Sequence, residues 1–149
     1  MSGSVSIVDQ NNNQIGTASA PLYTQGSGAP YLSTQTPITA SSGVVGNATA
    51  YANLTGGNTT TVYLAGFEVT GGGATAATVA NVTVTGTISG NLSYVFGAPL
   101  GAGVPAQPLT IEFNPPIPAS AVNTPISISV GALGTGNTKA AVTAHGFYQ

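Results

Sequence analysis

The sequence predicts an all-β protein, and three observations carry this prediction. From residue 60 onward, apolar and polar side chains alternate with a period of two, the repeat of a strand with one buried face. The helical period of 3.6 residues appears nowhere at useful length. Val, Ile and Thr dominate these segments, and Gly- or Pro-rich turns separate them. About seven such strands predict a β-sandwich, with jelly-roll topology once an N-terminal strand is added.

Residues 1–42 differ in character from the rest of the chain. Two short apolar stretches around the turn-like DQNNNQ indicate a small hairpin, and a Ser/Thr/Pro-rich stretch then indicates an extended linker. We place the boundary near Ser42, so that 1–42 is an N-terminal arm and 43–149 is the sandwich. Such an arm packs on its own sandwich or reaches a neighbouring chain. Its candidate interface anchors are the apolar and aromatic side chains Val5, Ile7, Ile15, Leu22, Tyr23, Tyr31 and Leu32.

The sandwich is expected to begin with a strand at residues 43–53, which glycines interrupt, and a second at residues 62–69. In the second strand, VYLAGFEV, alternation divides the side chains between two faces, one of which carries Glu68. We expect the other face to be the core face, because it is free of charge. Its members are Tyr63, Ala65, Phe67 and Val69.

Further strands are expected at residues 81–89, 91–96, 108–113, 126–130 and 140–148. In the first three of these, the alternation predicts the inward side chains Val82, Val84 and Ile88, then Leu92, Tyr94 and Phe96, then Leu109, Ile111 and Phe113. The Gly- and Pro-rich segments between the strands are expected as loops, including NPPIPASAVNTP at 114–125.

Charged side chains are scarce: Asp9, Glu68, Glu112 and Lys139 give a formal net charge of −2. Nucleic-acid binding relies on Lys and Arg to neutralise phosphates, so one Lys and no Arg argue against a nucleic-acid partner. The same scarcity disfavours an anionic membrane surface. No apolar run approaches the roughly 18 residues of a membrane-spanning helix. The first residues also lack the pattern of a secretory signal, so we expect no membrane segment and no export signal.

Few residues could carry out chemistry. The chain has no cysteine, and His145 is its one histidine. A catalytic triad would need His145 beside a carboxylate and a nucleophile on a strained turn, and no G-x-S-x-G motif is present. Glu68 and Glu112 could form a glycosidase-like pair, although single carboxylates in mid-strand usually face solvent or pair with a cation. Three separated acids also disfavour a calcium loop. We expect no enzymatic activity, no cofactor and no metal, with His145 on the outer or intersubunit face of the last strand.

Tyrosines and asparagines offer contact surface. Tyr23, Tyr31, Tyr51 and Tyr148 fall near the arm or near strand ends, where Tyr provides contact area with a polar tip. An interface role is favoured for them, with a sugar-stacking platform as the alternative. Five N-x-S/T triplets follow from the Asn- and Thr-rich composition and begin at Asn47, Asn53, Asn58, Asn81 and Asn91.

Two parts of the chain are similar to a known group of proteins. The stretch SIVDQNNNQIGTASAPLYTQ resembles the opening of many small virion proteins of tailed bacteriophages, with a short strand, a turn and a G-x-x-x-x-P-L strand. The stretches YLAGFEVTGGGATAATVANVTVTG, FNPPIPAS and AVTAHGFYQ resemble small β-sandwich proteins that recur among phage structural genes.

This resemblance implies a component of the virus particle, assembled in the host cytoplasm. It implies a capsid decoration (cement) or head-fibre protein, often a jelly roll and often a homotrimer, that binds the major capsid protein or other virion proteins. No catalytic residue is implied. A tail or fibre component is the first alternative, a carbohydrate-binding adhesin module is the second, and a glycosidase is the weakest hypothesis.

Overall fold

The structure is a computed structural model that describes residues 7–8, 14–15, 34–134 and 138–149. The chain divides into two compact units, Met1–Leu32 and Ser33–Gln149. In the first unit, β1 (Ile7–Val8) and β2 (Gln14–Ile15) pair antiparallel, with Ile7 opposite Ile15.

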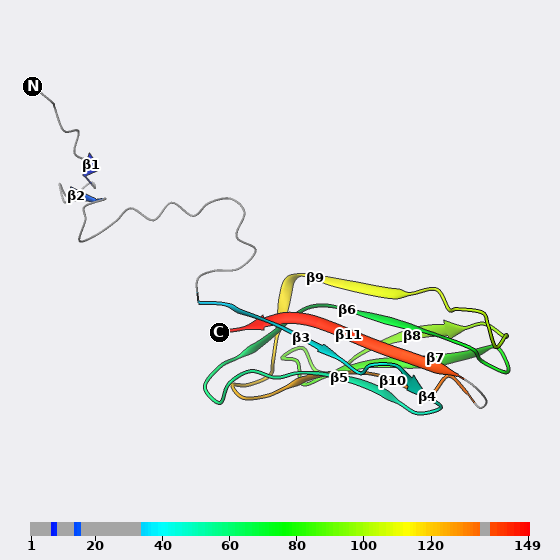
Figure 1. Cartoon of the computed structure of the whole chain (residues 1–149). Helices are drawn as coiled ribbons and strands as arrows, with labels where there is room; N and C mark the ends of the chain where they lie inside the picture. Colours follow the sequence, from blue (N-terminus) through cyan, green and yellow to red (C-terminus); the bar gives the residue numbers. More distant parts are fainter. Residues whose placement is uncertain (1–6, 9–13, 16–33, 135–137) are drawn as a thin grey trace, which may run out of the picture. The chain divides into compact units, whose positions relative to one another are not determined.

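Two antiparallel sheets make up the second unit, and no helix occurs among its described residues (Figure 1). One sheet has the strand order β5-β10-β7-β8, and the other has the order β3-β11-β6-β9, with β4 also paired to β11. The strands are β3 (Thr36–Ser41), β4 (Val45–Gly46), β5 (Ala50–Leu54), β6 (Val62–Gly72), β7 (Thr78–Thr85), β8 (Leu92–Ala98), β9 (Leu109–Pro118), β10 (Ile126–Val130) and β11 (Lys139–Tyr148). The all-β prediction is confirmed.

A single apolar core lies between the sheets. Val82 and Ile128 from one sheet and Leu64 and Val142 from the other are each 0% exposed and belong to the same cluster. Two sheets that bury facing side chains in one core form a β-sandwich. The expected strands at 91–96, 126–130 and 140–148 correspond to β8, β10 and β11, and the region 43–53 contains two strands, β4 and β5.

The five-stranded sheet begins within the segment that the sequence assigned to the arm. All six residues of β3 pair with β11, from Ser41 opposite Thr143 to Thr36 opposite Tyr148. Ile38 and Ala40 pack against the core. Thr fits the pleat of a strand, and Pro37 is tolerated because β3 is an edge strand. Residues 36–41 are therefore part of the sandwich, and the division between the units falls at Leu32 rather than at Ser42.

Two truncations should therefore behave differently. Removal of residues 1–32 should leave a β-sandwich that melts cooperatively. Removal of residues 1–42 also takes away β3, so it strips Ile38 from the core and leaves residues 143–148 of β11 unpaired on one side, at an expected cost of about 3 kcal/mol or more. Far-UV circular dichroism during thermal melting measures the unfolding midpoint of each truncated protein. Equal midpoints for the two truncated proteins would contradict the role of β3.

The core face of β6 changes partway along the strand. The side chains of Val62 and Leu64 are buried, and so are those of Phe67 and Val69. Against β11 the register shifts between Leu64 and Gly66, which makes Ala65 the extra residue of a β-bulge. Against β9 the extra residues lie on the other strand, because Leu64 is opposite Ile117 and Gly66 is opposite Glu112. The predicted core face is therefore correct for Phe67 and Val69 and wrong for Tyr63 and Ala65. A bulge reverses the alternation that the prediction assumed to continue.

Two further boundaries differ from the expectation. The strand expected at 81–89 ends at Thr85, because Gly86 takes a φ of +84°, and Ile88 is 65% exposed rather than inward. The strand expected at 108–113 continues to Pro118, into the predicted loop. Prolines are tolerated there because β9 is an edge strand. The half-buried Leu109, Ile111 and Phe113 pack against the core, as predicted.

Candidate functional site

The charged and imidazole side chains of the sandwich all lie on one surface, the outer face of the β3-β11-β6-β9 sheet. Glu68 projects from β6, Glu112 from β9, and Lys139 and His145 from β11. Their strand neighbours point the other way: Val69 next to Glu68 and Ala144 next to His145 are 0% exposed. Strand alternation therefore gathers these groups on the solvent side. The predicted position of His145 on the outer face of the last strand is confirmed.

Gly66 brings His145 and Glu112 together although β6 lies between their strands. The register places His145 of β11 and Glu112 of β9 opposite Gly66 on its two sides. His145 Nε2 lies 3.2 Å from Glu112 Oε2 across this glycine. A Cβ atom at position 66 would come within 2.5 Å of Glu112 Oε2 and 2.7 Å of the Ile111 carbonyl oxygen. Because Gly66 has no side chain, the His145 and Glu112 side chains have room to meet above it.

This arrangement supplies one element of a catalytic triad, a histidine beside a carboxylate. Across the ladder from His145 stands Thr39 of β3, a mid-strand threonine rather than a nucleophile on a sharp turn. The two side chains are 42% and 62% exposed, so the pair is open to water. Exposed ion pairs of this kind contribute at most about 1 kcal/mol. The geometry is that of a contact on a sheet surface.

Glu68 and Glu112 are diagonal neighbours on this face. Glu112 lies opposite Gly66, two residues from Glu68, and Glu68 itself lies opposite Thr110. Both carboxylates are exposed, and Glu112 is engaged with His145. A glycosidase holds its two carboxyl groups on either side of a bound sugar ring. Here both carboxylates project from the same exposed sheet face.

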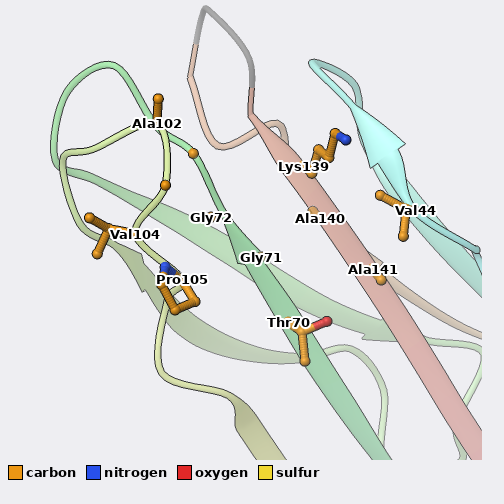
Figure 2. Close-up of a pocket in the computed structure, with 12 residues that line it drawn as sticks. Val44, Thr70, Gly71, Gly72, Ala102, Val104, Pro105, Lys139, Ala140 and Ala141 are labelled. Carbon is orange, nitrogen blue, oxygen red and sulfur yellow. The ribbon is translucent and has the colours of Figure 1, made fainter.

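A groove of about 550 Å³ lies near the end of the same face (Figure 2). Its floor is formed by small residues of β6 and β11, among them Gly71, Gly72 and Ala141. Val44 stands on one side, and the 102–105 loop stands on the other. Lys139 and Thr70 are its polar side chains, while Glu68, Glu112 and His145 do not line it. The groove therefore offers space and one ammonium group but no set of groups for acid–base chemistry.

The outer face of the other sheet is uncharged. Its cross-strand rows bring together Tyr51, Ser129, Thr83 and Ser93, and then Asn53, Ser127 and Thr85. The Ser127 hydroxyl donates a hydrogen bond to Asn53 Oδ1. Val79 and Val95 add exposed apolar surface, at 67% and 66% exposure. This surface, which we call the hydroxyl face, can make hydrogen bonds and apolar contacts without ionic interactions.

The remaining sequence predictions have different outcomes. The side chains of the candidate anchors Val5, Ile7, Ile15, Leu22, Tyr23, Tyr31 and Leu32 lie outside the described residues. Tyr51 is 57% exposed on the hydroxyl face, whereas Tyr148 packs against the core. The asparagines at positions 47, 53, 58, 81 and 91 are all exposed. Sequence reasoning missed the role of Gly66; a glycine inside a strand pattern was the available signal, because it often marks a close approach.

No protein-family model, no curated protein and no solved structure matches the chain. Among the residues that the structure describes, no group of three or more His, Cys, Asp or Glu side chains could hold a metal ion. The described part of the chain also contains no helix that is long and apolar enough to span a membrane.

Proposed function

We propose that the sandwich is a jelly roll. A jelly roll is a long antiparallel hairpin rolled into two sheets. Its first strand pairs with its last, its second strand with the second last, and so on towards the turn of the hairpin. The pairs observed here are β3 with β11, β5 with β10, β6 with β9, and β7 with β8. With the short β4 set aside, these are the first strand with the last, the second with the second last, and so on inward. This pairing order supports the assignment.

We propose that the protein is a non-enzymatic structural component of a bacteriophage virion, and most specifically a capsid decoration protein. The observation that carries the proposal is the hydroxyl face, a complete sheet surface without a charge. A protein that works as a free monomer relies on surface charge to resist association, whereas a protein held in an assembly does not. The jelly roll supports the same proposal, because capsid domains commonly use it. The sequence resemblance to phage virion proteins points in the same direction.

The partners in this proposal are further copies of the chain, as a homotrimer, and the major capsid protein. Attachment would use residues 1–32, with Val5, Ile7, Ile15, Leu22, Tyr23, Tyr31 and Leu32 as anchors. A tail or fibre position on the particle is compatible with the same features. The alternative from another class is a carbohydrate-binding adhesin, which Tyr51 favours, because an exposed aromatic ring among hydroxyl and amide groups can stack on a sugar. Lectin domains also use jelly rolls.

Self-association is the first test of the proposal. Sedimentation at low micromolar concentration should give about three times the chain mass of 14.5 kDa, since little charge repulsion keeps the copies apart. A monomer under these conditions would contradict the homotrimer and weigh against the virion assignment.

Location on the particle is the second part of the same test. Gold-labelled antibodies against the chain should decorate the heads of phage particles purified from the host that produces the protein. Label confined to tails would transfer the assignment to the tail alternative. Unlabelled particles, together with saturable binding to a glycan array, would replace the virion assignment with the adhesin.

A further inference from the structure

Strand β8 is the least protected sheet edge of the sandwich. Besides the two-residue β4, the sheets have four edge strands, and three of these have a feature that hinders pairing with another chain. Pro115, Pro116 and Pro118 interrupt β9, Pro37 interrupts β3, and the five-residue β5 lies against β3 and β11 of the other sheet. The seven residues of β8 contain neither a proline nor a charge, and they pair with β7 on one side only. The other side presents backbone groups that can receive a further strand.

The apolar core is only partly covered where β8 and β9 form the edges of the two sheets. Among the residues that the structure describes, nine hydrophobic ones are partly buried against the core, and five of these come from β8 and β9. These five are Leu92, Tyr94, Leu109, Ile111 and Phe113. In the middle of the sandwich, by contrast, Val82, Leu64 and Val142 are 0% exposed. A strand added beside β8 would cover apolar surface as well as satisfy backbone groups.

The sequence of β8 is complementary to itself in the antiparallel direction. Its central residue is Val95, so a twofold axis at this position places Val95 opposite Val95 of the second copy. Tyr94 then faces Phe96, Leu92 faces Ala98, and Ser93 faces Gly97 of the second copy. Pairs of aromatic and of β-branched residues stabilise antiparallel strands, while like charges would destabilise them, and β8 has no charge.

We propose that β8 pairs with β8 of a second copy of this chain, so that two four-stranded sheets join into one across a twofold axis. The contact is isologous, because each copy contributes the same surface. This twofold contact does not depend on the virion assignment. It is also distinct from the contacts within a homotrimer, because it joins two protomers or two trimers into a pair. One short strand pair buries little surface, so the association is weak and depends on concentration.

A cysteine at the axis tests the geometry directly. The chain contains no cysteine, so Val95→Cys introduces a single thiol per copy. Residues directly opposite in an antiparallel pair have Cα atoms about 4.5–5.5 Å apart, within the range of a disulfide. Oxidation by copper–phenanthroline should convert most of the variant into a covalent dimer on a non-reducing gel. Val79→Cys is the matched control, because Val79 has nearly the same exposure but lies on β7, one strand inward.

A lysine at the same position tests the association without cross-linking. Val95→Lys places two like charges opposite each other and should weaken the concentration-dependent doubling of mass in sedimentation at least tenfold. Val79→Lys adds the same charge to each copy and should leave the doubling intact. Equal behaviour of the two lysine variants, or equal cross-linking of the two cysteine variants, overturns the proposal. The results of these two experiments do not bear on where the protein lies on a particle, because the antibody labelling tests that location separately.

Discussion

Gly146→Ala is expected to destabilise the protein by about 3 kcal/mol or more, because a methyl group has no room at this position. An added Cβ atom would lie 1.9 Å from the Tyr63 carbonyl oxygen and 3.3 Å from the Ala65 nitrogen. Both atoms belong to the backbone of β6 beside its bulge, so no side chain can turn aside to relieve the overlap. β11 would have to move away from β6, at the centre of the five-stranded sheet.

Denaturant unfolding of purified variants measures this effect. Gly97→Ala is the matched control, because Gly97 also lies in a strand and an added Cβ atom there would have no neighbour within 4 Å. The control should stay within about 0.5 kcal/mol of the parent protein. A small effect of Gly146→Ala, comparable to that of the control, would show that the close approach of β11 to β6 is not required.

Phe67→Ala is expected to cost about 3–5 kcal/mol, the range for a large aromatic side chain removed from a core. Phe67 is 0% exposed and lies between the two sheets. Its ring contacts Tyr94 of β8 at a centroid distance of 5.5 Å and an interplanar angle of 64°, and Phe113 of β9 at 6.3 Å. Truncation would leave a cavity beside the partly buried rings of Tyr94 and Phe113.

A loss of this size is a large fraction of the roughly 5–15 kcal/mol that stabilises a domain, so the Ala variant could fail to fold. Phe67→Leu retains most of the apolar volume and should give a measurable intermediate loss. Ile88→Ala is the control, because Ile88 is 65% exposed and its truncation should change little. If all three variants unfold at the same denaturant concentration as the parent, Phe67 does not anchor the packing between the sheets.

The local alternation of apolar and polar residues predicted the regular strands well. The segment ISISV became β10 with the expected bounds, and its isoleucines and valine are buried while its serines face outward. The last strand and the inward faces of β8 and β9 also follow the alternation. In these strands each side chain needs only its own position in the pleat to select a face, which is information that a short stretch of sequence contains.

The candidate site was less predictable because its contacts join distant parts of the chain. His145 and Glu112 could each be placed on an outward strand face from the sequence. Their contact requires that β6 separates β11 from β9 and that Gly66 stands at the shared register position. No spacing within the sequence encodes that register. The same holds for the groove, which combines β6 and β11 with Val44 and the 102–105 loop.

The sequence by itself determined the all-β class, most strand positions and the scarcity of charge, because composition and a period of two are local properties. The tertiary structure decided where the alternation is reversed and where a strand can contain proline. Ala65 becomes a bulge through the register in which β6 pairs with β11, and β9 continues through its prolines because it lies at a sheet edge. Pairing between distant strands sets both outcomes, since backbone hydrogen bonds depend on which strand lies alongside and in which register.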